Sequence, residues 1–356
     1  MILVGDVSPE KIKARTEQIK GRIVLIDWEE IFSEGFRKAL ARLLASYMLF
    51  KEAGAVAVIF PDPALNNVLG DSIDLIPDAK VSPLPMAEIC LEDVKLIRRL
   101  LAQGPVRIEF EFENRVSGAT QVNNIVAEIP GSEKPAEWIL IGAHLDSWDL
   151  GSGTQDNGTG SVMVLETARA FAALQKAPSR TVRFVLWAGE EQGYLGSRAY
   201  IQAHFSELGN CVAVLNTDDG AGHPRGWEVK GRKDVKEAMK PISDYLLKDL
   251  GGGELSEAID FIDDDGMFML QGIPVLDFLA DESHYQEIHH KSSDTFDKVD
   301  ALNFKAGAAI VAVTAYAVAQ QAQPIAPHIG HAAVAEILKK NPDLDFLLTS
   351  EGLWKP

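Results

Sequence analysis

The sequence has few cysteines, no long apolar run and comparatively little positive charge, and each shortage excludes a class of protein. Only Cys90 and Cys211 occur among 356 residues, too few for a disulfide framework or a thiolate zinc site. No run approaches the roughly 20 apolar residues that span a bilayer, so no membrane span is predicted. Lysine and arginine number 34 against 52 acidic residues. The resulting formal charge of -18 repels phosphate backbones, so nucleic acid is not an expected partner.

The composition and the first hundred residues indicate a globular protein with more than one unit. Apolar residues make up 46% of the chain and charged residues 24%, which suits a large buried core. Apolar runs at residues 22–27 and 55–60 flank an amphipathic pattern that starts after Ser33 and ends at Gly54, so we predict a small α/β unit. Residues 106–112 alternate apolar and charged side chains, which predicts a half-buried strand.

From residue 123 onward, strand-like apolar runs alternate with helix-like stretches. The runs cover residues 124–129, 138–143, 182–187, 212–215 and 275–279, and the helical stretches cover residues 160–174, 195–204, 235–250 and 301–320. This alternation predicts an α/β fold in which a mixed, mostly parallel sheet is sandwiched by helices. We therefore divide the chain into an N-terminal domain at residues 1–116, a second domain at residues 117–322 and a helical tail at residues 323–356.

Histidine and carboxylate side chains follow three of the predicted strands. His144 follows the second strand of this domain, Glu190 and Glu191 follow the third, and Asp218 follows the fourth. The carboxyl ends of parallel strands meet at one edge of a sheet, where functional groups gather. Asp146 lies on the same side of an extended segment as the histidine two residues earlier, where a carboxylate can orient a metal-bound imidazole.

Each candidate taken singly also has an ordinary structural explanation. Asp156 lies in a glycine-rich turn and could cap the helix that follows it. Glu190 and Glu191 could be solvated surface residues, although adjacent carboxylates after an apolar strand favour a nearby cation. His289 and His290 are neighbours that point different ways, so at most one is expected to bind a metal.

Taken together, the candidates offer two imidazoles and three or four carboxylates, with no thiolate. This set of ligands suits zinc in an open catalytic site, with manganese and cobalt as alternatives. Two ions that share a carboxylate could polarise a carbonyl and supply hydroxide near neutral pH. Amide hydrolysis is the predicted reaction.

The motifs HLDSWDLGSGTQDNG, FVLWAGEEQGYLGS, LNTDDG, GIP and HHKSSDT occur in this order. Over about residues 123–320 they resemble the co-catalytic dizinc aminopeptidases, most closely the carboxypeptidase Q branch, whose fold is a zinc exopeptidase fold. The resemblance implies two zinc ions per chain. It implies that His144 and Asp218 bind one zinc, that Glu191 and His290 bind the other, and that Asp156 bridges them.

The same resemblance implies roles for residues beside these ligands. Glu190 would take a proton from the attacking water and hand it to the leaving amine, and Asp146 would orient the first histidine ligand. The family's last ligand stands four residues before an aspartate, here Asp294, which implies His290 rather than His289. His289 would then help to stabilise the oxyanion.

Further expectations come from the resemblance alone. It implies a cis peptide bond between Asp156 and Asn157. Residues 1–116 resemble a protease-associated domain, chiefly through KGRIVLID and KEAGAVAVIF. Relatives carry a helical segment before this domain, and the chain begins too late to contain it, so we expect either a fragment or dispensable helices. The implied substrates are dipeptides or short peptides with a free amino terminus, and a homodimer and a secreted or periplasmic location are implied as well.

Two other functions remain as alternatives. One is a metal-free binding module with a peptidase fold, as in the transferrin receptor, and the other is a single-zinc enzyme similar to glutaminyl cyclase. The presence of five ligands together with Glu190 favours the peptidase. The preferred side chain of the substrate is not predicted.

Overall fold

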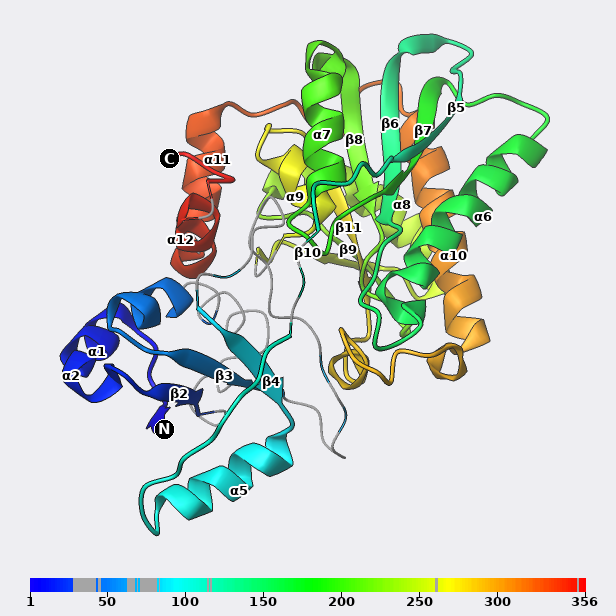
Figure 1. The fold of residues 1–356 in the computed structure, drawn as a ribbon. Helices are drawn as coiled ribbons and strands as arrows, with labels where there is room; N and C mark the ends of the chain where they lie inside the picture. Colours follow the sequence, from blue (N-terminus) through cyan, green and yellow to red (C-terminus); the bar gives the residue numbers. More distant parts are fainter. Residues whose placement is uncertain are drawn as a thin grey trace.

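The protein is built around two separate sheets, seen in a computed structural model (Figure 1). The structure describes residues 1–27, 43, 46–62, 68, 70, 82, 84–113, 115, 117–259, 262–350 and 352–356. The smaller sheet lies in the N-terminal part of the chain, and the larger sheet carries the predicted site residues.

The smaller sheet has four parallel strands in the order β1-β2-β3-β4. The described elements of this N-terminal unit are β1 (Ile2–Val4), α1 (Pro9–Ala14), α2 (Thr16–Ile19), β2 (Ile23–Ile26), β3 (Ala57–Pro61), β4 (Met86–Ile89) and α5 (Leu91–Leu101). Buried aliphatic residues from β2 and β3 enter clusters on both faces of this sheet. Strands covered on both faces read as continuous apolar runs, which is why β2 and β3 were visible in the sequence.

Two predictions for the N-terminal unit, a helix and a strand, were not fully confirmed. Of the helix predicted between Ser33 and Gly54, Leu43 and residues 46–52 are helical, and much of the rest lies outside the described residues. The strand predicted at residues 106–112 is wrong, because this segment joins neither sheet. Its alternation has another cause: Ile108 and Phe110 pack against a small apolar cluster beside the sheet.

The larger sheet has seven strands in the order β10-β9-β11-β8-β6-β7-β5, and all neighbouring pairs are parallel except β9 with β11 and β5 with β7. The strands are β5 (Ile125–Ile129), β6 (Lys134–His144), β7 (Arg180–Trp187), β8 (Cys211–Asn216), β9 (Pro224–Glu228), β10 (Glu254–Ser256) and β11 (Val275–Ala280). The predicted mixed, mostly parallel sheet is confirmed. The short strands β9 and β10 were not predicted, since neither has a long apolar run.

Helices cover both faces of this sheet. They are α6 (Thr159–Ala173), α7 (Leu195–Ala203), α8 (Lys233–Ile242), α9 (Asp264–Met269), α10 (Ala301–Gln320), α11 (His331–Leu338) and α12 (Pro342–Ser350). Residues of α6, α8 and α10 form one core cluster with the sheet, and residues of α7, α9, α11 and α12 form the other. The helical tail therefore packs on the larger sheet, so its apolar residues belong to the same core.

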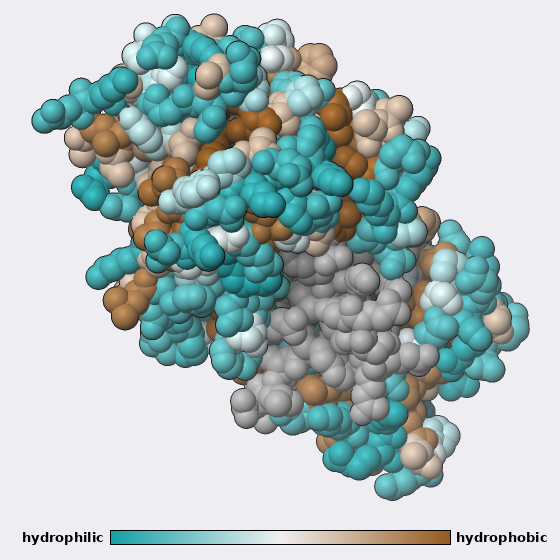
Figure 2. Space-filling model, turned by 180° about the vertical axis from the view of Figure 1, so that it is seen from behind, coloured by the Kyte–Doolittle hydropathy of each residue, from teal (hydrophilic) through white to brown (hydrophobic). Residues whose placement is uncertain are grey.

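Helix α10 is long and predominantly apolar, and one side of it belongs to the core. Its first turn is capped by Asp300, whose carboxylate accepts hydrogen bonds from the backbone N–H groups of Leu302 and Asn303. Among the described residues it alone is long and apolar enough to cross a membrane by length and composition. Ile310 and Val318 are fully buried against the sheet, which accounts for this composition. Figure 2 shows the molecule from behind, and hydrophilic side chains predominate on that face.

The approach of β6 to the side chain of Trp187 requires glycine at position 142. A Cβ atom on Gly142 would lie 2.5 Å from Trp187 Nε1 and 2.9 Å from its Cε2 atom. Gly142→Ala should therefore lower the free energy of unfolding by about 1–3 kcal/mol through overpacking, measured by urea denaturation. Gly209→Ala is the matched control, because an added Cβ there meets no described atom within 4 Å. Equal effects of the two substitutions would contradict this account.

Candidate metal centre

The predicted site residues meet at the carboxyl edge of the larger sheet. His144 is the last residue of β6, Asp218 lies two residues after β8, and Glu190 and Glu191 follow β7. Asp156 comes from η3 (Thr154–Gly158), the turn that leads into α6. Because β6, β7 and β8 are neighbouring parallel strands, the fold brings these side chains to one place.

Asp156 lies between two histidines and faces each with a different oxygen. Its Oδ1 atom is 3.1 Å from His144 Nε2, and its Oδ2 atom is 3.2 Å from His290 Nε2. His144 Nε2 is also 3.0 Å from Asp218 Oδ1, and His290 Nε2 is also 3.0 Å from Glu191 Oε2. The five residues thus form two groups of one imidazole and two carboxylates, with Asp156 common to both.

The protonation of His144 follows from its other ring nitrogen. Nδ1 lies 2.8 Å from the backbone carbonyl oxygen of Asp146. A carbonyl can only accept a hydrogen bond, so Nδ1 carries a hydrogen, and in the neutral ring Nε2 presents a lone pair. That lone pair faces two carboxylate oxygens, an arrangement that is favourable only with a proton or a metal cation among the three atoms.

Asp146 also has a second function that was not predicted. Its carboxylate oxygen is 3.9 Å from His144 Nδ1, so the close contact to the imidazole comes from its backbone and not from its side chain. The carboxylate instead accepts hydrogen bonds from the backbone N–H groups of Gly189, Glu190 and Glu191, at 2.8, 3.1 and 3.2 Å. Asp146 therefore fixes the turn that carries both glutamates.

The backbone around Asp156 is held by Asp294. The two oxygens of Asp294 accept hydrogen bonds from the backbone N–H groups of Gln155 and Asp156, at 2.8 and 3.1 Å. The peptide bond between Asp156 and Asn157 is cis, as the resemblance implied. Asn157 donates to the carbonyl of Thr217 beside Asp218, so the shared carboxylate is tied to two neighbouring loops.

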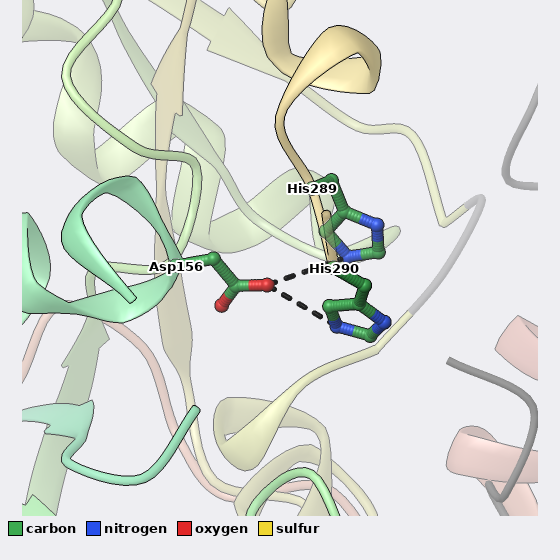
Figure 3. Close-up of side chains that lie close together, drawn as sticks. All are labelled: Asp156, His289 and His290. Carbon is green, nitrogen blue, oxygen red and sulfur yellow. Dashed lines mark ion pairs between the residues drawn. The ribbon is translucent and has the colours of Figure 1, made fainter. Parts of the chain in front are cut away.

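The two adjacent histidines differ in their distance from the carboxylates. In Figure 3 both rings lie on the same side of Asp156, from a loop that faces the start of α6. The rings are stacked, with centroids 3.7 Å apart and planes 18° apart. His289 Nε2 is 3.7 Å from Asp156 Oδ2, farther than His290 Nε2. These distances favour His290 as the ligand and leave His289 at its side.

Burial and mutual charge shift the titration of the whole cluster. Burial alone would lower the pKa of His144, but the carboxylates of Asp218 and Asp156 raise it well above its usual value. Burial likewise opposes a raised pKa at His290, yet Glu191 and Asp156 raise it to about 10. Burial raises the pKa of Glu190 well above its usual value, and the charges of Glu191 and Asp218 add to this against the effect of His144.

The residues present fit metal ions. Asp156 Oδ2 and both oxygens of Glu191 are buried, and among the described residues they have no donor besides the imidazoles that face them. Ligand atoms of His144, Asp156 and Glu191 lie within 4.8 Å of one another. A set of imidazoles and carboxylates without thiolate is typical of an open zinc site.

Three residues at this edge were not singled out in the sequence. Asp263 has an oxygen within 4.8 Å of oxygens of Glu190 and Asp218, and the Tyr285 hydroxyl donates to the backbone carbonyl of Asp218 at 3.2 Å. The ring of Trp148 is 5.9 Å from that of His290. The run of three aspartates that begins at Asp263 was a signal for the first of these, whereas nothing local marked the tyrosine.

A family comparison covers the part of the chain that carries these residues. The model of peptidase family M28 matches residues 124–315, which include all five residues of the two groups. The chain belongs to peptidase family M28. Carboxypeptidase Q of Mus musculus is 29% identical over 318 residues, 87% of this chain and 65% of that protein. Carboxypeptidase Q of Homo sapiens is 32% identical over 245 residues, 67% of this chain and 50% of that protein.

Solved structures of the family support the fold. A peptidase M28 precursor from Shewanella amazonensis has 26% identity and a TM-score of 0.76, covering 92% of this chain and 75% of that one. A zinc aminopeptidase from Bacillus subtilis has 20% identity and a TM-score of 0.59, covering 92% and 77%. The predicted family and fold class are confirmed. The chain spans between half and two thirds of the length of these two carboxypeptidase Q relatives.

In the metal-free M28 chain, the cluster should lose stability as pH rises. The pKa of His290 is about 10 in the folded protein, against about 6.5 in an unfolded chain. Its stabilising contribution is therefore complete below about pH 6.5 and is lost as pH rises toward 10. Urea unfolding of chelator-treated protein across this range should show the decline, and zinc affinity should rise over the same range because the ligand must be neutral.

The His290→Ala variant is the control for this pH dependence. Other groups titrate in both proteins, so the informative quantity is the difference in free energy of unfolding between the unmodified chain and the variant. That difference should shrink with rising pH. A difference that stays constant from pH 6.5 to 10 would contradict the raised pKa of His290.

Proposed function

We propose that this chain is a dizinc metallo-exopeptidase that hydrolyses the terminal peptide bond of dipeptides or short peptides with a free amino terminus. The observation that carries the proposal is the pair of groups that share Asp156, each with one histidine nitrogen facing two carboxylates. Membership of a peptidase family supports it, as does the zinc in the name of the Bacillus subtilis aminopeptidase.

In this proposal His144 and Asp218 would hold one zinc ion, Glu191 and His290 would hold the other, and Asp156 would be shared by both. The chemistry supplied by bound zinc is Lewis-acid polarisation of a carbonyl and a lowered pKa of water. Asp146 orients His144 through its carbonyl oxygen and holds the glutamate turn through its carboxylate.

Glu190 is the proposed base and then the proposed acid. It is buried beside Asp218 and Asp263 and has a raised pKa because of burial. A carboxylate with a raised pKa accepts a proton from water and returns it to a leaving amine near neutral pH more readily than an exposed one. Glu190 would thus carry the proton from the nucleophile to the departing peptide.

His289 is the proposed donor to the oxyanion. Its ring stacks on His290, and it lies farther from Asp156 than His290 does, so a zinc ion would leave it available for the substrate. A donor aimed at the developing charge stabilises a tetrahedral oxyanion.

The unit at residues 1–116 is proposed to be a protease-associated domain. A homodimer and a secreted or periplasmic location stay predictions.

Glu190 and Glu191 offer a matched pair of substitutions. Glu190→Gln keeps the shape of the side chain but cannot accept a proton, so turnover should fall by ~100-fold or more with both zinc ions retained. Glu191→Gln should instead lose one zinc equivalent. Metal content and kcat measured on the same samples check this, and near-normal turnover of Glu190→Gln would refute its role.

The substrate class can be tested with peptides that differ only at the amino terminus. A dipeptide with a free amine should be hydrolysed. For its N-acetylated form, kcat/KM should be lower by on the order of 100-fold or more, because the carboxylates of the site would face a neutral amide in place of the amine. A peptide with N-terminal glutamine serves as the comparison. Its cyclisation without hydrolysis would favour a cyclase, and zinc-free folded protein would favour a binding module.

A further inference from the structure

The loop that carries His290 is anchored by a lysine that reaches the N-terminal unit. The Nζ atom of Lys291 donates to the carbonyl oxygen of His289 at 2.9 Å and lies 3.5 Å from Asp62 Oδ1. The Lys291 side chain is 4% exposed, and that of Asp62 is fully buried. Asp62 directly follows β3 of the smaller sheet, so this ion pair connects the two parts of the chain.

The backbone makes the same connection. Gly70 of the N-terminal unit forms an isolated antiparallel bridge with Lys291. A Cβ atom on Gly70 would lie 2.3 Å from Asp62 Oδ2 and 2.8 Å from Glu88 Oε1, so Gly70 packs directly on these two acids. Burial, and after it the charge of Asp62, raises the pKa of Glu88 to about 8.

Lys291 also connects to the shared carboxylate. The backbone N–H of Asp294 donates to the carbonyl of Lys291 at 3.0 Å, and the side chain of Asp294 holds the backbone N–H groups of Gln155 and Asp156. A movement of Lys291 would therefore disturb His290 on one side and Asp156 on the other. Both are proposed ligands of the same zinc ion.

We propose that the N-terminal α/β unit positions one half of the metal centre through the buried Asp62–Lys291 ion pair, which makes Lys291 and Asp62 positioning residues. This rests on the dizinc site of the proposed function. A buried pair loses much more when one partner is removed than an exposed pair does, because an uncompensated charge is left behind. Outer contacts that orient metal ligands are commonly worth 10–100-fold in affinity.

The test uses the full chain with Lys291→Met, Asp62→Asn and the double variant, and it measures stepwise zinc affinity by competition with a chelator. Each single variant should weaken one of the two zinc equivalents by about 10-fold or more, with a smaller loss at the other. The double variant should bind zinc no worse than Lys291→Met, because the two residues act through one interaction. Zinc affinity needs no substrate, so this result is independent of whether peptides are hydrolysed.

Arg98→Met is the control. Arg98 pairs with Asp27 at 3.4 Å inside the N-terminal unit, so its loss removes a cation from that unit while Asp62 and Lys291 are both kept, and zinc affinity should stay unchanged. Wild-type affinity in both single variants would overturn the proposal. So would an equal loss in Arg98→Met, or fully additive losses in the double variant, since a general loss of stability would then explain the data. Asp62→Asn keeps the inference testable if Lys291→Met fails to fold.

Discussion

The site depends on one constraint: a single carboxylate, Asp156, must face two imidazoles with its two oxygens. This requires the backbone before α6 to present the side chain between two loops, and two hydrogen bonds do so. Asp294 holds its backbone N–H, and Asn157 donates to the carbonyl of Thr217. Three other proposed ligands, His144, Glu191 and Asp218, then need only to stand at neighbouring strand ends, which a parallel sheet supplies without further adjustment, whereas His290 comes from a loop.

The sequence predicted the parts of the site that local patterns determine. His144, Glu190 and Asp218 follow continuous apolar runs, and the edge at which parallel strands end is fixed by the fold class, so their meeting could be predicted without coordinates. The pairing of Glu191 with His290 depended on the family resemblance, because the histidine lies in an irregular loop. No periodic pattern in the sequence distinguishes His290 from His289 as the proposed ligand.

Other features could not be predicted because they arise from contacts between distant segments. The ion pair of Lys291 with Asp62 joins two units, and although Lys291 lies in the motif HHKSSDT, nothing in the sequence connects it with Asp62. The carboxylate of Asp146 was expected beside an imidazole, but three backbone N–H groups of the following turn offer it better hydrogen bonds. The strand predicted at residues 106–112 was wrong for a different reason. Alternating apolar and charged residues indicate only that one side of the segment is buried, and a loop packed against the core shows this pattern as well as a strand does.

The electrostatics of the cluster explain why these contacts extend so far from the ligands. Three carboxylates and two imidazoles stand together with side chains at most 9% exposed, and carboxylates at such short distances repel one another unless protons or cations stand between them. The loops that carry them would separate if nothing held them, and most of the ligands stand on loops. Asp146 and Asp294 hold two of these loops within the larger unit. The third carries His290, and Lys291, which pairs with Asp62, holds it from outside that unit. A metal centre of the proposed kind needs rigid support for its side chains before any metal binds, and the contacts of Asp146, Asp294 and Lys291 are the support that we propose.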